Sequence, residues 1–259
     1  MNDHGRDQSR DLLLVVARAP IAGFSKTRLG TAIGMDAAAL LHRAFLEDIS
    51  EAFFASDLVL NGIARGWAYT PPSFDFQQFV STFTLTEVTS PATFVCQVGE
   101  NFGDRLTNLL AWSTAHAFQR TVIMASDSPQ LEPSIVGDAF VALVDHDLVI
   151  GRVLDGGYYL VGSRGYTEIL SHVPMSTPDA AQALVDEAVK QGLSVAELPR
   201  DFDVDVAADL DLLVRCLMPA GKRAPATFRM LQSLGLIDKS PGRTTDSAAH
   251  CHDSSDASE

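Results

Sequence analysis

Thr121-Val-Ile-Met-Ala-Ser-Asp-Ser-Pro-Gln-Leu131 is the stretch from which the fold is best worked out. Its apolar run, Val122 to Ala125, is too short for a helix and has the length of a buried strand. The polar residues 126–129 then break the run. In an open parallel α/β sheet, ligands bind just beyond the carboxyl ends of the strands. Asp127 in that place is suited to hold a divalent ion; the alternative is that Asp127 and Ser128 only begin the next helix.

The rest of the chain alternates between strand-like and helix-like segments. Short extended runs predict strands at residues 12–17, 58–64, 94–98, 146–153 and 194–198, and residues 83–88 fit either a strand or a loop. Apolar residues at helical spacing predict helices at residues 36–54, 104–118, 133–145, 179–191 and 209–217. This alternation predicts an α/β protein of three layers (α/β/α) with a mostly parallel mixed sheet.

The composition indicates one folded domain with polar ends. Of the 259 residues, 46% are hydrophobic, which is enough for a sizeable core. Residues 1–10 are polar and are expected to form a disordered leader. Residues 239–259 are rich in Ser, Asp and His and have too little apolar content to fold, so they are expected to form a disordered tail. No repeat or linker divides the remainder, which predicts a single domain at residues 11–238.

Charge and cysteine content exclude several classes of function. A net charge of −14 argues against nucleic-acid binding, which rests on basic patches. No apolar run approaches the roughly 20 residues of a membrane span, and the polar N-terminus does not have the pattern of a signal peptide. The three cysteines, Cys96, Cys216 and Cys251, have neither disulfide nor metal-ligand spacing. We therefore expect a cytoplasmic protein.

A basic loop flanked by glycines follows the first expected strand: Gly23-Phe-Ser-Lys-Thr-Arg-Leu-Gly30. Exposed backbone amides together with Lys26 and Arg28 suit a triphosphate or a pyrophosphate, because Arg28 can contact phosphate oxygens through two N–H groups. We assign Gly23, Lys26 and Arg28 to phosphate binding. The alternative is that both cations are merely solvated. The Walker A pattern is absent.

Asp155-Gly156-Gly157-Tyr158-Tyr159 also follows an expected strand. Paired glycines let the backbone approach a ligand closely or take a positive φ angle. Tyr158 can stack on a base or a sugar, or belong to the core. We assign Gly156, Gly157 and Tyr158 to substrate binding, and Asp155 as the candidate catalytic base. The alternative, a Gly-Gly hairpin, is disfavoured because the preceding strand is expected to be parallel.

Phe202-Asp203-Val204-Asp205 follows the last expected strand, and alternation places Asp203 and Asp205 on one face. Two like-charged carboxylates on one face are costly unless they are solvated or bind a cation. Asp127 and Asp205 are therefore assigned as ligands of Mg²⁺ or Mn²⁺, hard ions that take oxygen ligands and bridge to phosphates. Helix capping by Asp205 or Asp209 is the alternative.

Histidines contribute little to the predicted site. The chain has no Ser-His-Asp or Cys-His arrangement that suggests a nucleophile. His42, on the first expected helix, and His146, before a strand, are interpreted as structural.

The motifs resemble those of a bacterial family of glycosyltransferase-A-type transferases known as DUF2064, often described as nucleotide-diphospho-sugar transferases or arsenosugar-type glycosyltransferases. The resemblance covers residues 11–217 in consistent order, on Arg18–Leu29, Gly103-Asp-Arg105, Ser126–Pro129, Asp155–Gly162 and Asp203-Val-Asp205. It implies a nucleotide-diphospho-sugar transferase fold (GT-A, Rossmann-like).

The resemblance also implies site residues. It places Arg105 among the nucleotide-binding residues and lets Asp127 stand for the acidic metal-binding motif. Two positions depart from the family pattern: Arg18 stands where the family usually has Lys, and Ser128 stands where it usually has Cys. A single Asp rather than Asp-x-Asp keeps open a similarity to nucleotidylyltransferases of the same fold.

The leading hypothesis is a metal-dependent transferase that moves a glycosyl group from a nucleotide-diphospho-sugar to a small acceptor. The second is a nucleotidylyltransferase that joins a nucleoside triphosphate to a phosphorylated small molecule and releases pyrophosphate. The third is an inactive nucleotide-binding protein of the same fold. Retention of the cations and the carboxylates together argues against the third hypothesis.

Overall fold

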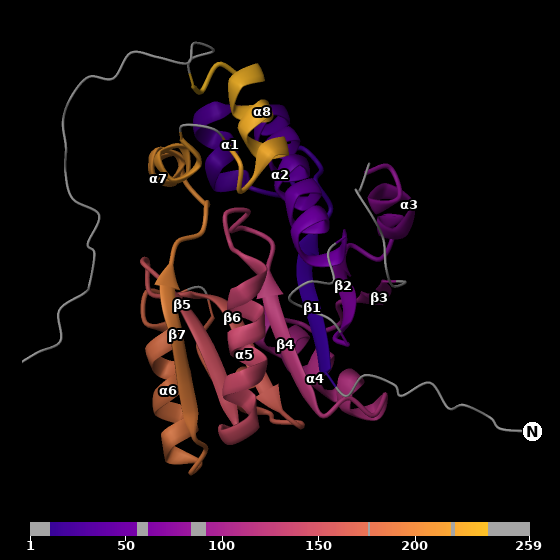
Figure 1. The fold of residues 1–259 in the computed structure, drawn as a ribbon, viewed down its shortest axis with the longest axis vertical. Coiled ribbons are helices and arrows are strands. Elements are labelled where there is room, and N and C mark those ends of the chain that lie inside the picture. Colours follow the sequence, from indigo (N-terminus) through magenta and orange to yellow (C-terminus); the bar gives the residue numbers. More distant parts are fainter. Residues whose placement is uncertain (1–10, 56–61, 84–91, 176, 219–220, 238–259) are drawn as a thin grey trace, which may run out of the picture.

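The computed structural model describes residues 11–55, 62–83, 92–175, 177–218 and 221–237. Its strands form a seven-stranded sheet in the order β3-β2-β1-β4-β6-β5-β7 (Figure 1). In chain order the strands are β1 Asp11–Arg18, β2 Ala64–Thr70, β3 Thr93–Cys96, β4 Arg120–Ala125, β5 Leu148–Val153, β6 Tyr158–Arg164 and β7 Val195–Asp201. Strand β6 runs antiparallel to both of its neighbours, and the other pairings are parallel. The predicted mixed, mostly parallel sheet is confirmed.

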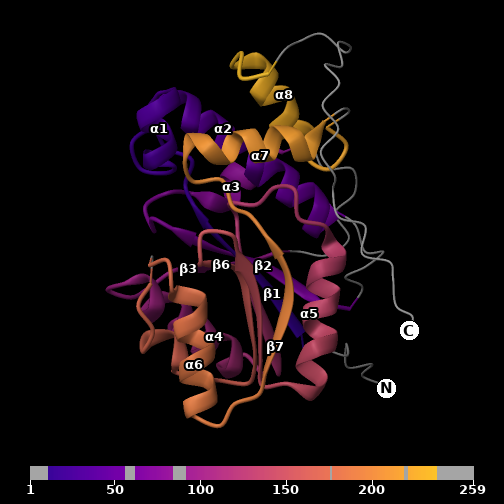
Figure 2. The same ribbon diagram turned by 90° about the vertical axis from the view of Figure 1, so that its left-hand side faces the viewer.

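Helices cover both faces of the sheet and one of its ends. They are α1 Thr27–Ile33, α2 Met35–Ser50 with a π-helical continuation Glu51–Ala55, α3 Phe76–Val80, α4 Phe102–Ala115, α5 Pro133–Asp145, α6 Ala180–Lys190, α7 Ala207–Leu217 and α8 Pro225–Ser233, and a 3₁₀ turn spans Ile169–Ser171. Figure 2 shows α5 on one face of the sheet and α4 and α6 on the opposite face. Helices α1, α2, α7 and α8 lie together beyond the carboxyl ends of β1, β4 and β7 (Figures 1 and 2).

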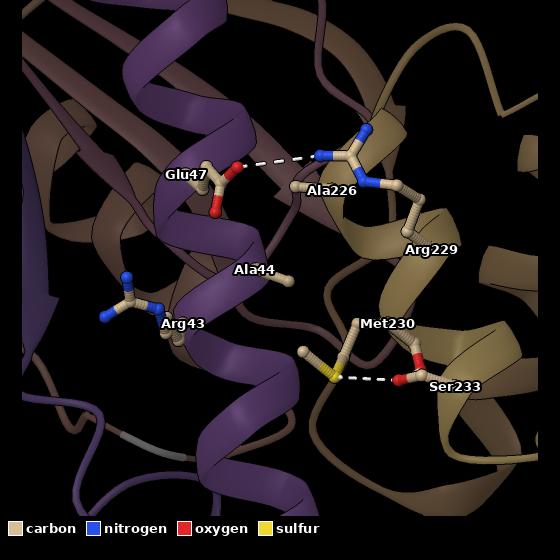
Figure 3. Close-up of a pocket in the computed structure, with 7 residues that line it drawn as sticks. All are labelled: Arg43, Ala44, Glu47, Ala226, Arg229, Met230 and Ser233. Atoms are coloured by element: carbon tan, nitrogen blue, oxygen red, sulfur yellow. Dashed lines mark hydrogen bonds and ion pairs between the residues drawn. The ribbon is translucent and has the colours of Figure 1, made fainter. Parts of the chain in front are cut away.

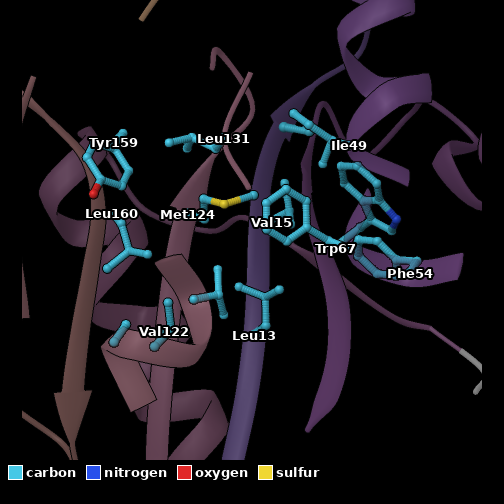
Figure 4. Packing of buried hydrophobic residues seen from close by; sticks show 14 of the residues in the cluster. Leu13, Val15, Ile49, Phe54, Trp67, Val122, Met124, Leu131, Tyr159 and Leu160 are labelled. Atoms are coloured by element: carbon cyan, nitrogen blue, oxygen red, sulfur yellow. The ribbon is translucent and has the colours of Figure 1, made fainter. Parts of the chain in front are cut away.

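Strand β1 is central because both of its faces are buried. Leu13 and Val15 face the core on the α5 side, which also contains Trp67 and Met124 (Figure 4). Leu12 and Leu14 face the second core, under α4 and α6. Continuous apolar strands of this kind occur where helices cover both faces of a parallel sheet. Since ligands bind beyond the carboxyl ends of such strands, this arrangement predicts a functional site between these strand ends and the group α1, α2, α7 and α8.

The four end helices have a core of their own. Leu29, Leu41, Val204 and Leu213 are fully buried there, so this core joins α1 and α2 to the segment after β7 and to α7. Helix α8 is attached to α2 by Asp48, whose carboxylate accepts hydrogen bonds from the backbone N–H groups of Ala226 (2.8 Å) and Thr227 (2.7 Å). These donors belong to the first turn of α8, where backbone N–H groups have no partner within the helix.

The predicted β2 position was wrong. Sequence patterning placed a strand at residues 58–64, of which 58–61 lie outside the described residues; the strand runs over Ala64–Thr70. Its sequence, Ala-Arg-Gly-Trp-Ala-Tyr-Thr, shows little apolar alternation. A charged residue, Arg65, occupies a buried position of this strand, where it donates to the Phe54 carbonyl (3.3 Å). The segment 83–88, left between strand and loop, lies outside the described residues except Phe83, which is buried.

The predicted chain direction after residue 153 was also wrong. Strands β5 and β6 form an antiparallel hairpin, and Leu154–Gly157 is its turn. Four residues are too few for the crossover that a parallel neighbour requires, so the Gly-Gly hairpin that the sequence analysis disfavoured is the correct reading. Helices α1, α3 and α8 and strand β6 were not predicted. Among the described residues, no helix combines the length and apolar character needed to span a membrane.

The attachment of α8 predicts a pH dependence of stability. Burial raises the pKa of Asp48 to about 6 from its ordinary 3.8, although the bonds from Thr227 and Ala226 oppose the rise. Folding therefore takes up a proton between these values, and the stability that Asp48 contributes falls as the pH rises through them. Relative to Asp48→Asn, the wild type should lose about 3 kcal/mol at most between pH 4 and pH 6. Urea unfolding across this range measures the difference, and a difference that grows with pH would contradict the assignment.

Gly156 in the hairpin turn predicts a second effect on stability. Its φ is +93°, and an added Cβ would overlap the Pro178 carbonyl. Gly23, with φ +75°, has nothing within 4 Å of an added Cβ and is the matched control. Gly23→Ala should cost roughly 1 kcal/mol of unfolding free energy, and Gly156→Ala about 2–4 kcal/mol, because the second adds a steric clash to the same backbone strain. Equal losses in urea unfolding would show that the contact with Pro178 is unimportant.

Candidate functional site

A buried lysine lies between two of the predicted metal ligands. The Lys26 ammonium is 2.6 Å from Asp127 Oδ1 and 2.8 Å from Asp205 Oδ1. The Lys26 side chain is 4% exposed, whereas the side chains of Asp127 and Asp205 are 34% and 38% exposed. The structure thus brings together residues separated by about one hundred and about eighty positions in the chain. The two carboxylates converge on one cation from one side and remain open to solvent on the other.

Backbone contacts hold the two acidic loops together. The Val204 N–H donates to the Asp127 carbonyl (3.0 Å), and the Ser128 hydroxyl donates to the Phe202 carbonyl (2.8 Å). The Gln130 side-chain amide donates to the same Phe202 carbonyl (2.7 Å). The end of β4 is therefore fixed to the end of β7, although the two strands are not neighbours in the sheet.

The helix-capping alternatives do not describe these two acids. Helix α5 begins at Pro133, several residues beyond Asp127. At α7 it is Asp209 whose carboxylate accepts hydrogen bonds from the N–H groups of Asp205 and Val206, both at 2.8 Å. Asp209 thus caps the helix and leaves the Asp205 carboxylate directed to Lys26.

The basic loop presents its two cations differently. Gly23 takes φ +75°, and Lys26 itself has the left-handed backbone (φ 51°, ψ 39°) that L-residues seldom adopt. This turn directs the Lys26 side chain inward. Arg28 remains on the surface, with its side chain 68% exposed and Nη1 3.7 Å from Asp205 Oδ2. The solvated-cation alternative is therefore wrong for Lys26 and describes Arg28.

The charges of the cluster stabilise one another. Burial opposes the charged form of Lys26, but Asp127 and Asp205 outweigh it and hold the pKa of Lys26 above its ordinary value. Burial likewise opposes ionisation of Asp127, and the adjacent Lys26 outweighs it, so the pKa of Asp127 is lowered. The lysine is thus an ammonium and Asp127 a carboxylate at neutral pH.

Asp203 and Asp155 extend the negative charge of the site. Burial, followed by the charges of Asp205, Asp155 and Asp127, raises the pKa of Asp203 to about 7. Asp155, in the β5–β6 turn, is exposed and its carboxylate accepts a hydrogen bond from the Gly157 N–H (3.0 Å). The predicted catalytic residue therefore lies within electrostatic reach of the acids that follow β7.

His42, which the sequence analysis interpreted as structural, is a buried neighbour of the ion pair. It lies on α2, is 2% exposed, and neither ring nitrogen has a hydrogen-bond partner among the described residues. Burial lowers the pKa of His42 to about 4, with smaller effects from Asp127, Lys26 and Arg18. It is neutral at physiological pH and close to the ion pair. Its place in the apolar stripe of α2, between Leu41 and Phe45, is the signal that could have revealed its burial.

The remaining predicted residues lie as follows. Arg105 is in the first turn of α4, where Nε donates to the Asn101 carbonyl (3.2 Å). Tyr158 packs against the core on the α4 and α6 side and its hydroxyl donates to Met175 Sδ (3.1 Å), which favours the core alternative for this ring. Gly156 contacts the backbone at Pro178, so packing accounts for the absence of a side chain there.

A divalent ion fits the chemistry of the Asp127–Asp205 pair. In the described part of the chain, no group of three or more His, Cys, Asp and Glu side chains is arranged to hold a metal ion. The Lys26 ammonium is nevertheless a stand-in cation, because both carboxylates contact it at less than 3 Å. Mg²⁺ commonly uses one or two protein carboxylates and takes its other ligands from water and substrate phosphates. Metal binding by Asp127 and Asp205 stays a prediction.

A separate pocket of about 360 Å³ lies between α2 and α8 (Figure 3). Arg43, Glu47, Arg229 and Met230 contribute to its lining, and Arg229 Nη2 is 3.6 Å from Glu47 Oε1. None of the predicted site residues lines this pocket. The ion-pair cluster, rather than this pocket, is the candidate active site.

Comparison with known proteins supports the fold and the family resemblance. The chain superposes with a TM-score of 0.75 on a crystal structure from Desulfovibrio desulfuricans G20, provisionally assigned as a nucleotide-diphospho-sugar transferase. The two share 27% sequence identity over 87% of this chain and 96% of that chain. This likeness confirms the predicted nucleotide-diphospho-sugar transferase fold.

Residues 68–177 match the DUF2064 family. Its description reads "Uncharacterized protein conserved in bacteria (DUF2064)". The match confirms the resemblance predicted from the motifs, and it contains Asp127 and Asp155 but neither Lys26 nor Asp205. No curated protein matches the chain in sequence.

More distant structures align with most of this chain at lower similarity. One is CMP:2-keto-3-deoxy-manno-octonic acid synthetase complexed with CTP, at 15% identity and a TM-score of 0.46, covering 80% of this chain and 98% of that chain. Another is a manganese complex of Rv0371C from Mycobacterium tuberculosis H37Rv, at 18% identity and a TM-score of 0.40, covering 79% and 98%. Likenesses at this level carry no conclusion about the function of this chain.

The buried ion pair predicts a difference between the two cations of the loop. Lys26→Met should lower the free energy of unfolding at neutral pH by roughly 1–3 kcal/mol, because it leaves two carboxylates facing each other without a cation. Arg28→Met, the control on the same loop, should change it by less than about 0.5 kcal/mol, because its side chain is exposed.

The same pair gives the expected pH dependence. The lowered pKa of Asp127 contributes stability that is present above its ordinary 3.8 and is lost as the pH falls. The loss caused by Lys26→Met should therefore be nearly constant from about pH 7 to about pH 4 and should shrink as the pH falls further, because the Asp127 carboxylate of the wild type then becomes protonated. Urea unfolding at about pH 7, pH 4 and pH 3 measures it. A loss that is equal for Lys26→Met and Arg28→Met would refute the buried pair.

Proposed function

We propose that the protein is a metal-dependent transferase that moves a glycosyl group from a nucleotide-diphospho-sugar to a small acceptor in the cytoplasm. One observation carries this proposal: the Asp127 and Asp205 carboxylates converge on a single cation at the carboxyl ends of β4 and β7. The structural likeness to the Desulfovibrio desulfuricans G20 protein supports the class of donor. Fold alone would not, because one fold serves many functions.

Asp127 and Asp205 would hold Mg²⁺ or Mn²⁺ in this proposal. When bound, the ion supplies charge neutralisation to the departing diphosphate. The outer sides of both carboxylates are about one-third exposed, which leaves room for ligands that come from the substrate.

In this proposal the phosphates are bound by arginine side chains and by the backbone of the loop after β1. Arg28 is the accessible cation, and its planar guanidinium can donate two hydrogen bonds to one phosphate. Gly23 lies in the turn that begins this loop, and an added side chain there would meet no atom, so the backbone is open to a ligand. Arg105, at the start of α4, is assigned to the same nucleotide.

Asp155 is the candidate general base of this reaction. It would accept the proton of an acceptor hydroxyl at a carboxylate oxygen. Two observations support this role: Asp155 is exposed, and its charge acts on Asp203 of the neighbouring acidic segment. The hairpin turn positions it, since the Gly157 N–H donates to Asp155 Oδ1. Gly156 and Gly157 keep their assignment to the substrate side as parts of this turn, whereas the Tyr158 ring packs against the core.

A thermal-shift screen tests the proposal. The wild type, Asp127→Asn, Asp205→Asn and the exposed control Asp211→Asn are each heated with nucleotide-sugars or nucleoside triphosphates, in Mg²⁺, Mn²⁺ or EDTA. A ligand at one hundred times its Kd stabilises the native state by about 2.7 kcal/mol, which raises Tm. We expect one nucleotide-sugar to raise Tm of the wild type and of Asp211→Asn in metal only, and to leave both site variants unchanged.

Other outcomes separate the rival functions. A metal-dependent shift with a triphosphate alone, followed by release of pyrophosphate, would identify a nucleotidylyltransferase. An equal shift in EDTA with no turnover of any donor would identify an inactive nucleotide-binding protein. A shift that Asp127→Asn and Asp205→Asn retain would remove the metal site from the proposal.

A further inference from the structure

We propose that Lys26 and the divalent ion compete for the same two carboxylates, so that the protein binds metal tightly only when nucleotide phosphates draw the lysine away. This inference rests on the metal site proposed above and adds a regulation to it. In the resting protein the ammonium is the resident cation. In the loaded protein the metal takes its place, and Lys26 turns to the phosphates.

The contacts of Lys26 carry this inference. Its ammonium binds Oδ1 of both Asp127 and Asp205, so the oxygens that converge on one point already have a cation there. An ammonium and a dication cannot share that point, because like charges a few ångströms apart repel strongly at the low effective dielectric of a half-buried site. Metal binding by the converging oxygens therefore requires displacement of Lys26.

The charges in contact favour the displacement. The single positive charge of the ammonium faces two carboxylates, those of Asp127 and Asp205. A dication offsets more of this negative charge than the ammonium does. What opposes the exchange is the burial of the lysine, whose ammonium would lose both of its partners on leaving.

A bound diphosphate removes that opposition. Lysine has a flexible four-carbon stem and three donors, so it can exchange carboxylate oxygens for phosphate oxygens without a change in the fold. Arg28 stands beside Asp205 with its side chain 68% exposed, which places a second cation where phosphates would enter. Metal and diphosphate then favour each other's binding, and this coupling is reciprocal by linkage.

Direct titration with Mn²⁺ tests the competition. Calorimetry of the wild type, Lys26→Met, Asp127→Asn and the control Lys190→Met is carried out with Mn²⁺ alone and with Mn²⁺ in the presence of UDP, GDP, CDP or ADP in turn. We expect Lys26→Met to bind Mn²⁺ alone about tenfold more tightly than the wild type, because the competing cation is gone. The effective diphosphate should tighten Mn²⁺ binding by about tenfold in the wild type and much less in Lys26→Met.

Two controls keep the result interpretable. Lys190→Met, the same change at an exposed lysine of α6 that pairs with Glu187, should leave the affinity for Mn²⁺ alone unchanged. Lys26→Gln replaces Lys26→Met if the latter does not fold, because its amide can still donate to the carboxylates but carries no charge; the same tightening is expected.

The outcomes distinguish this inference from the proposed function. If the wild type binds Mn²⁺ with a diphosphate, but neither Lys26 variant binds Mn²⁺ alone more tightly, the competition is refuted and the metal site stands. If Asp127→Asn binds Mn²⁺ as well as the wild type does, or if no protein binds Mn²⁺ under any condition, both the competition and the proposed metal site are refuted.

Discussion

An ammonium group cannot be buried without counter-charges, and this constraint organises the site. Lys26 is almost completely removed from solvent, so the free energy of its desolvation must be offset by close carboxylates. Asp127 and Asp205 meet that need only if the ends of β1, β4 and β7 are held together. The hydrogen bond from Val204 to Asp127 and the bonds that Phe202 accepts do this directly. The packing of the three strand ends therefore also determines how the charged groups of the site are positioned.

The end helices complete the burial of the lysine. Leu29 lies near the end of the basic loop, on α1, and Val204 lies between Asp203 and Asp205 after β7; both are fully buried in the same core. Any movement of the acidic loop consequently disturbs the packing of α1, α2 and α7. His42 occupies the same region without a hydrogen-bond partner among the described residues, so the neighbourhood of the pair includes a polar group whose orientation the packing alone determines. A site of this kind is rigid at its base and open at its rim.

The spacing of apolar residues predicted helices and strands correctly where a segment follows a single clear pattern. Strand β1 is apolar on both faces and α5 has a clear apolar stripe, so both were found, α5 with the same limits that the structure shows. Strand β2 was misplaced because Arg65 and Gly66 interrupt its apolar run. The direction of β6 could not be inferred from its composition; only the length of the preceding turn, Leu154–Gly157, decides it. Proximity of Lys26 to both acids is a long-range property that no local pattern contains.

The sequence therefore predicted that cations and acids would gather at strand ends, but not which would pair with which. Acids expected to chelate a metal and a lysine expected to hold phosphate instead bind each other. The predicted roles and the observed ion pair are compatible. Carboxylate oxygens can bind either an ammonium or a metal ion, and an ammonium can bind either a carboxylate or a phosphate. A ligand-free arrangement selects the partners available within the chain. A ligand that carries phosphate would offer Lys26 other anionic partners. Because the Asp127 and Asp205 side chains are more than one-third exposed, such a ligand can reach the ion pair from solvent.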